Sequence, residues 1–154
     1  MNTTEEILHR VIALAQQSRD AGNHPFAAIV IASNGGTLAE AFNDSHSDCT
    51  GHAELVAVRK VSSRLKPAEL RSATLYSSAE PCAMCAGAIY WSGIGRVVYA
   101  LSEERLLQLT GNHPENPTLS LPCREVFARG QREIEVIGPM LEEEAAAPHR
   151  GFWR

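Results

Sequence analysis

Three residues with zinc-binding side chains stand at a spacing that suits a metal site. Cys82 follows His52 at a distance of 30 residues, and Cys82 and Cys85 form a C-x-x-C pair directly after Pro81. Imidazole and thiolate are ligands that Zn²⁺ favours, and three protein ligands leave the fourth tetrahedral position open for water. We therefore predict that His52, Cys82 and Cys85 bind one Zn²⁺ per chain as a catalytic metal.

Glu54 is the predicted proton carrier of this site. It lies two residues after His52, too close along a helix to be a comfortable ligand but close to the open position. Zinc lowers the pKa of bound water from about 15.7 to roughly 7, which provides a hydroxide nucleophile at neutral pH. A neighbouring carboxylate can take up the proton that the water loses and pass it on to a reacting group.

Other interpretations of these residues remain open at this point. A C-x-x-C pair is also found in redox sites, and two cysteines can be inert buried thiols. A closed structural zinc site, in a non-catalytic zinc-binding module, would need a fourth protein ligand, and His46, Cys49 and Cys123 are candidates. That alternative leaves Glu54 without a role, unless Glu54 is a solvated carboxylate on a helix.

The elements that position these residues follow from hydrophobic periodicity and turn residues. We predict helices at 3–21, 52–65, 82–91, 102–107, 125–129 and 141–147, and strands at 25–33, 37–43, 74–78, 97–101 and 133–137. Both cysteines then lie at the start of one helix, where the positive end of the helix dipole favours thiolates.

The order of these elements predicts an α/β fold with a mixed five-stranded sheet and helices on both faces. The turn at 34–36 (Asn-Gly-Gly) makes the first two strands a hairpin, and the last two strands are expected to be parallel across a helical connection. Residues 110–122 are irregular and rich in proline, which in a compact domain usually indicates a functional loop. We expect residues 1–154 to form a single domain.

Composition limits the partners and the compartment. The chain has 14 Lys and Arg against 18 Asp and Glu, for a net charge of −4, which is a poor basis for gripping nucleic-acid phosphates. The four cysteines fit a reducing compartment better than a disulfide framework. The N-terminus has no signal-peptide pattern, and no apolar run reaches the roughly 18 residues of a membrane span. We expect a cytoplasmic protein that binds neither membranes nor nucleic acid.

These motifs resemble the cytidine deaminase superfamily, in which H-x-E combined with P-C-x-x-C is the signature of zinc nucleobase deaminases. The resemblance rests on His24-Pro25-Phe26, Asn43, His52-Ala53-Glu54 and Glu80-Pro81-Cys82-Ala83-Met84-Cys85-Ala86-Gly87-Ala88-Ile89. Residues 88–91 (Ala-Ile-Tyr-Trp) are particularly similar to bacterial guanine deaminases. The resemblance implies a three-layer α/β/α fold, a homodimer, one zinc per chain and hydrolytic release of ammonia from an aminated heterocycle.

Several polar and aromatic residues are candidates for holding the substrate. Asn43 can donate to and accept from a base edge, and the Ala53 N–H at a helix start has no intrahelical partner. Phe26 and Trp91 can stack on a heterocycle, although each also fits a core or a dimer interface. His24 is a further candidate, with a structural histidine as the alternative. Asn43 is alternatively a turn residue at the end of a strand.

The C-terminal tail, residues 148–154, is a predicted lid. Phe152 and Trp153 can close over the pocket, as the resemblance to guanine deaminases suggests, and a frayed tail is the alternative. The loop after Leu101 lacks the aspartate that guanine deaminases place near their substrate. The residues available in its place are Glu103, Glu104, His113 and Glu115.

The predicted function is therefore zinc-dependent hydrolytic deamination of a small aminated base or nucleoside, with a guanine-like substrate as the first choice. The runner-up is a tRNA adenosine deaminase, which shares the zinc motif. Such an enzyme needs basic and aromatic surface to hold a strand and a flipped base, and the net negative charge disfavours this.

Overall fold

The computed structural model describes residues 2–154, which are built around one sheet with the strand order β2-β1-β3-β4-β5. The strands are β1 (Ala27–Ile31), β2 (Thr37–Phe42), β3 (Thr74–Ala79), β4 (Arg96–Leu101) and β5 (Glu135–Ile137). β1 pairs antiparallel with β2 and β3, whereas β3, β4 and β5 run parallel. The predicted mixed five-stranded sheet is confirmed, including the parallel pairing of its last two strands.

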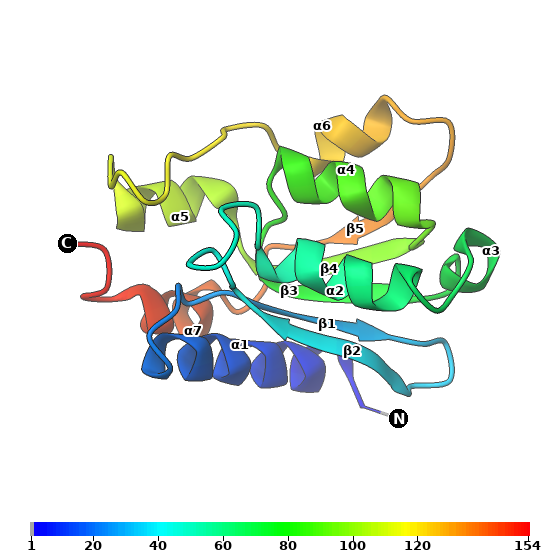
Figure 1. Cartoon of the computed structure of the whole chain (residues 1–154), viewed down its shortest axis with the longest axis horizontal. Coiled ribbons are helices and arrows are strands. Elements are labelled where there is room, and N and C mark those ends of the chain that lie inside the picture. Colours follow the sequence, from blue (N-terminus) through cyan, green and yellow to red (C-terminus); the bar gives the residue numbers. More distant parts are fainter. Residues whose placement is uncertain (1) are drawn as a thin grey trace.

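Helices cover both faces of the sheet, so the fold has three layers (Figure 1). The helices are α1 (Thr4–Asp20), α2 (Ala53–Ser62), α3 (Pro67–Leu70), α4 (Ala83–Ser92), α5 (Glu103–Thr110), α6 (Cys123–Ala128) and α7 (Glu142–Ala146), and the 3₁₀ turn η1 (Ala147–His149) follows α7. α1 and α7 lie on one face, and α2 and α4 lie on the other. The sequence prediction missed α3, because four residues are too few to show a helical period.

Two hydrophobic clusters, one on each face, hold the layers together. Ala28 and Val30 of β1 belong to the cluster under α2 and α4, whereas Ile29 and Ile31 belong to the cluster under α1. All five residues of β1 are buried because the strand is covered on both sides. This explains why β1 reads as a continuous apolar run rather than as an alternating one.

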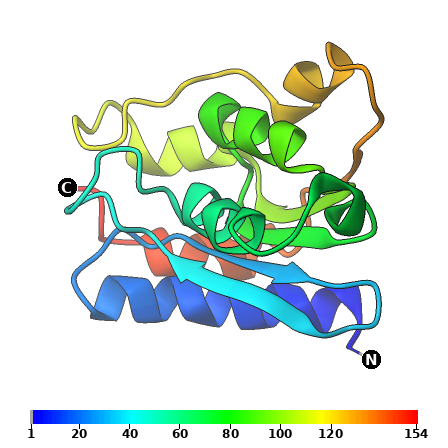
Figure 2. The same ribbon diagram turned by 45° about the vertical axis from the view of Figure 1, so that its right-hand side comes forward.

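Three segments that are distant in sequence meet at one end of the molecule. They are the connection from β2 to α2, the connection from α5 to α6, and the C-terminal tail after η1, and both views place them on the same side (Figures 1 and 2). Within residues 2–154, no helix combines the length and the apolar character that crossing a membrane requires.

Candidate active site

His52 and Cys82 are the N-cap residues of α2 and α4. Each helix therefore begins one residue later than predicted. Both residues have extended backbones, with φ −66° and ψ 145° at His52 and φ −67° and ψ 173° at Cys82, and neither side chain caps its own helix. Since the side chains are not used for capping, the imidazole and the thiol are free to face each other across the two helix starts.

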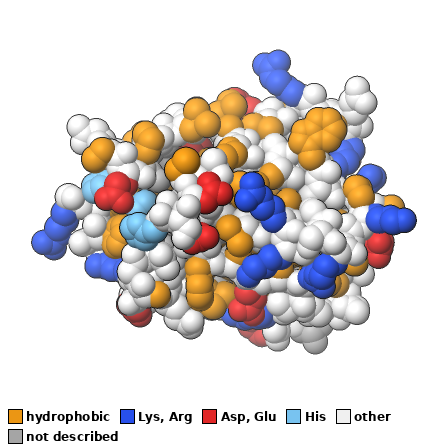
Figure 3. Space-filling model, in the orientation of Figure 1, with side chains coloured by type: hydrophobic (Ala, Val, Ile, Leu, Met, Phe, Trp, Pro, Cys, Tyr) orange, Lys and Arg blue, Asp and Glu red, His pale blue; other side chains and the backbone are white. Residues whose placement is uncertain are grey.

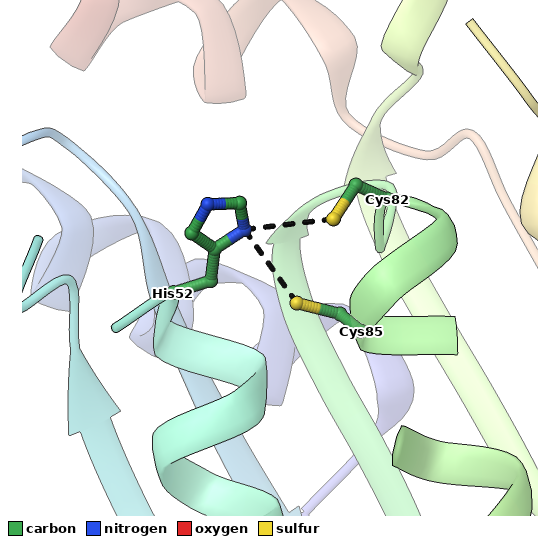
Figure 4. Close-up of side chains that lie close together, drawn as sticks. All are labelled: His52, Cys82 and Cys85. Atoms are coloured by element: carbon green, nitrogen blue, oxygen red, sulfur yellow. Dashed lines mark hydrogen bonds between the residues drawn. The ribbon is translucent and has the colours of Figure 1, made fainter. Parts of the chain in front are cut away.

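The three predicted metal ligands come together in the structure (Figure 4). His52 Nδ1 lies 3.5 Å from Cys82 Sγ and 3.6 Å from Cys85 Sγ, and the three ligand atoms lie within 4.8 Å of one another. Tetrahedral zinc with bonds of about 2.0 Å to nitrogen and 2.3 Å to sulfur would separate these atoms by about 3.6 Å. The donor set and its spacing therefore fit a zinc ion.

A fourth protein ligand is absent from this cluster within the part of the chain that the structure describes. His46 instead hydrogen bonds to the Gly22 carbonyl, Cys49 is exposed, and Cys123 is buried elsewhere beside Glu80. The arrangement has the open position that a catalytic zinc site requires, and it gives no support to a closed structural site.

The two thiols have opposite proton affinities. The hydrogen bond from Cys85 and the neighbouring His52 lower the pKa of Cys82 to about 4, against the opposing effect of burial. The hydrogen bond to Cys82, together with burial, raises the pKa of Cys85 well above its ordinary value. The lowered pKa of Cys82 favours its thiolate, which is the form that binds a metal.

Glu54 is buried beside this cluster, with only 6% of its surface exposed. Burial, and next the negative charge of Cys82, raise the pKa of its carboxyl to about 7. The alternative of a solvated helix carboxylate is therefore wrong. A carboxyl that titrates near neutral pH is suited both to accept and to donate a proton.

A cavity of about 470 Å³ opens beside Glu54 and the three-residue cluster. Of the predicted substrate-binding residues, Asn43, Phe26 and His24 line it. Asn43 Oδ1 accepts hydrogen bonds from the Ser45 N–H at 3.0 Å and the Ser45 hydroxyl at 2.7 Å. Because its oxygen is engaged, Asn43 can offer its amide N–H groups to a ligand.

The loop that was predicted to be functional lines this cavity, and the predicted lid packs against residues that line it. Residues 114–119 line it, and Glu115 Oε1 lies 3.0 Å from His24 Nε2. Trp153 packs outside the lining, with its ring centroid 5.0 Å from that of His24 and 6.1 Å from that of Phe26. Histidine and acidic side chains gather at this end of the molecular surface (Figure 3).

Besides Trp153, two predicted substrate-binding residues do not line the cavity. Trp91 is 80% exposed near the far end of α4, because nine helical residues after Cys82 carry the chain about 13 Å away from the site. Ala53 is fully buried as the first residue of α2. Its N–H, like that of any first helical residue, lacks an intrahelical acceptor.

Glu80 has a structural role that the sequence prediction did not include. Its Oε1 accepts the Glu103 N–H and its Oε2 accepts the Cys123 N–H, each at 3.0 Å. One carboxylate thus caps the first residues of both α5 and α6. Little in the sequence indicates this role, because the residues at the start of α5 and of α6 do not show which distant side chain accepts a hydrogen bond from the first N–H.

The fold and this grouping of side chains define the class of the protein: they are those of zinc-type nucleobase deaminases. A family model described as the cytidine and deoxycytidylate deaminase zinc-binding region matches residues 1–101. The chain belongs to the cytidine and deoxycytidylate deaminase family. It is a deaminase, a hydrolase that acts on the C–N bonds of cyclic amidines.

Individual relatives differ in their substrates. The chain is 43% identical to a probable cytosine deaminase of Schizosaccharomyces pombe over 95% of its own length and 90% of the relative. It is 40% identical to a guanine deaminase of Bacillus subtilis over 62% of its own length and 63% of the relative. A solved guanine deaminase structure from Nitrosomonas europaea has a TM-score of 0.78 at 26% identity, covering 97% of this chain and 84% of that one.

Proposed function

We propose that this deaminase hydrolyses a small aminated base or nucleoside, with guanine as the first choice, and that His52, Cys82 and Cys85 hold one zinc ion per chain. The observation that carries the proposal is the position of Glu54. Its buried carboxyl shares one cavity with a three-ligand cluster whose atoms have the spacing of a tetrahedral zinc site.

The residues of the chain have distinct tasks in this reaction. A zinc ion held by His52, Cys82 and Cys85 would supply a hydroxide nucleophile at neutral pH, because it would lower the pKa of water to roughly 7. Glu54 takes up one proton from the water and delivers it to a ring nitrogen. It then takes up the second proton, from the hydroxyl added to the ring carbon, and delivers it to the amine, which leaves as ammonia while the carbonyl forms. The amide of Asn43 donates to acceptor atoms of the heterocycle. Phe26 and His24 contact the faces and edges of the ring.

Guanine remains the first choice because the chain aligns over almost its whole length with a guanine deaminase structure. Cytosine is a second candidate, since the relative that matches 95% of this chain is named a probable cytosine deaminase. We place tRNA adenosine third. A strand would have to pass the loop 114–119 and the tail at Trp153, and a net charge of −4 does not attract phosphates.

The test is ammonia release from guanine, cytosine, guanosine, cytidine and adenosine by the zinc-loaded protein, beside inosine formation in tRNA. We expect turnover of at least one base or nucleoside, about one zinc per chain by elemental analysis, and loss of most zinc in Cys82→Ser. Cys49→Ser, which removes a cysteine outside the cluster, should keep the metal. Efficient tRNA editing with no turnover of small substrates would overturn the substrate choice. Full zinc content in a His52→Ala, Cys82→Ser, Cys85→Ser triple variant would overturn the ligand assignment.

A further inference from the structure

Glu103 is a second buried carboxyl in the cavity, and the proposed chemistry does not use it. It is the first residue of α5, only 9% of its surface is exposed, and it lines the same cavity as Glu54. Its Oε2 is buried and has no hydrogen-bond partner within residues 2–154. A buried polar atom without a partner costs about 1–3 kcal/mol, so its position beside a ligand cavity needs a reason.

The backbone that carries Glu103 is fixed on both sides. Its N–H donates to Glu80 Oε1 at 3.0 Å, and the neighbouring Ser102 hydroxyl accepts the Arg105 N–H at 3.1 Å as the helix cap. The side chain therefore projects from a rigid helix start. A residue that is to contact a ligand with defined geometry needs such a fixed position.

The other carboxylates of the cavity outside the reacting centre already have donors. Glu80 accepts two backbone N–H groups, and Glu115 is paired with His24. Asn43 presents donors, because its oxygen is occupied by Ser45. Glu103 Oε2 is therefore the unfilled acceptor of the lining, and it calls for a ligand that brings an N–H group.

One N–H distinguishes a free base from the corresponding nucleoside. In cytosine and guanine the nitrogen that would carry the sugar bears a hydrogen, and it lies next to an acceptor, O2 in cytosine and N3 in guanine. We infer that Glu103 binds this donor–acceptor edge of an unsubstituted base, so that the site takes free bases in preference to nucleosides. The inference rests on the proposed function and narrows its substrate class.

The protonation of the Glu103 carboxyl is consistent with hydrogen bonds to both atoms of that edge, the N–H and the neighbouring acceptor. Burial, followed by the nearby Glu80, Cys82 and Glu54, raises the pKa of Glu103 to about 8. A neutral carboxyl has an O–H donor beside its carbonyl acceptor, so it can make two parallel hydrogen bonds to an N–H and its neighbouring acceptor. A nucleoside presents a glycosidic bond at this place and would leave the buried Oε2 of Glu103 unpaired.

The test compares Glu103→Gln and Glu103→Leu with the unchanged protein on the pairs cytosine and cytidine, and guanine and guanosine. Glutamine keeps one donor and one acceptor, whereas leucine keeps only the bulk. We expect Glu103→Leu to lower kcat/KM for the free base by about 10- to 100-fold, mainly through KM, and to leave the nucleoside value within about twofold. Glu103→Gln should retain most of the preference. Glu104→Leu, at the exposed neighbouring position, is the matched control.

Binding measured apart from turnover separates this inference from the proposed reaction. Calorimetric titration of each base and nucleoside into zinc-loaded Glu54→Gln, with and without Glu103→Leu, reports on the edge contact even if no ammonia is released. Base binding that depends on Glu103 without any turnover in the unchanged protein would reject the reaction and keep the contact. An equal loss for base and nucleoside, a loss for the nucleoside alone, or no loss in Glu103→Leu would each overturn the inference.

Discussion

Environment, more than residue type, sets the chemistry of individual side chains in this protein. Glu54 and Glu144 are both glutamates on helices, yet Glu54 is buried beside a thiolate with a pKa of about 7, whereas Glu144 is exposed on α7. Cys82 and Cys85 are separated by one helical turn, but one has a lowered pKa and the other a raised pKa. Differences of this kind distinguish groups that can move protons or bind a metal from ordinary surface groups.

Glu54→Gln should therefore keep zinc and substrate binding while kcat falls by at least about 100-fold, because the amide cannot carry a proton. Zinc content by elemental analysis and steady-state kinetics on the active substrate measure the two effects separately. Glu144→Gln, a matched change on an exposed helix face, should leave both unchanged. Loss of the metal in Glu54→Gln would instead make Glu54 a ligand.

At the level of secondary-structure elements, long-range side-chain contacts hold the helix starts around the site. Glu80 lies between the end of β3 and the start of α4, and its carboxylate caps α5 and α6. Arg19 of α1 has a comparable role for the tail, since its Nη1 donates to the Pro148 and Arg150 carbonyls at 2.9 and 2.7 Å. The loops at the cavity are thus tied to the sheet and to α1.

Glu80→Ala should lower the free energy of unfolding by about 2–4 kcal/mol, because it leaves two backbone N–H groups without an acceptor. Denaturant unfolding of the metal-loaded protein measures the loss. Glu80→Gln keeps an acceptor oxygen and should lose less, and Glu144→Ala should stay within about 0.5 kcal/mol of the unchanged protein. Equal stability of Glu80→Ala and Glu144→Ala would show that the double cap contributes nothing.

The tail contains a pH-sensitive anchor. His149 is buried, and its Nδ1 accepts the Trp153 indole N–H at 3.0 Å. Burial, and then the positive charge of Arg19, lower the pKa of His149 to about 4 from an ordinary value of 6.5. Between these two values the unfolded chain binds the proton and the folded chain does not. Stability from this residue is therefore full above pH 6.5 and is lost as the pH falls toward 4.

We expect the unfolding free energy to fall by up to about 3 kcal/mol across that window, and the slope to become shallower in His149→Gln. Thermal or denaturant unfolding at pH 7, 6, 5 and 4 gives the profile, and hydrogen exchange of residues 150–154 shows whether the tail opens first. His9→Gln, at an exposed position on α1, is the control. An unchanged slope in His149→Gln would remove His149 as the anchor.

At the scale of the whole molecule, the candidate site occupies one end of the sheet and an exposed aromatic occupies another part of the surface. Trp91 is 80% exposed and lies edge-on to Tyr90, with ring centroids 5.3 Å apart. A large exposed aromatic side chain of this kind is typical of an interface between proteins. Together with the family resemblance, it favours a homodimer that uses this part of α4.

Light scattering at micromolar concentration should accordingly give about twice the mass of the chain, and Trp91→Arg should shift the protein toward a monomer. Leu119→Arg, which changes another exposed apolar residue in the loop between α5 and α6, should leave the mass unchanged. A monomer in the unchanged protein would reject the dimer, and a dimer that tolerates Trp91→Arg would move the interface elsewhere.

Much of the fold was readable from local patterns. The helical period of α1, the continuous apolar run of β1 and the Asn34–Gly36 turn each predict an element, because backbone conformation and burial impose a repeat on the chain. The sequence did not predict α3, because this helix is too short to show a helical period of apolar residues. The starts of α2 and α4 were placed one residue early, because the spacing of apolar residues does not distinguish a cap from a first helical residue.

The sequence by itself determined the reaction class, because each motif holds its ligands within a few residues of the chain and the two motifs together resemble the signature of zinc nucleobase deaminases. Tertiary structure alone decided which other residues share the cavity. It brought Glu103 and the 114–119 loop to Glu54 and left Trp91 on the surface. These placements depend on the directions in which α4 and α5 extend from the sheet. They also depend on which distant carboxylate accepts a hydrogen bond from the first N–H of a helix. Contacts between elements that are far apart in the chain produce no periodic pattern of residues in the sequence.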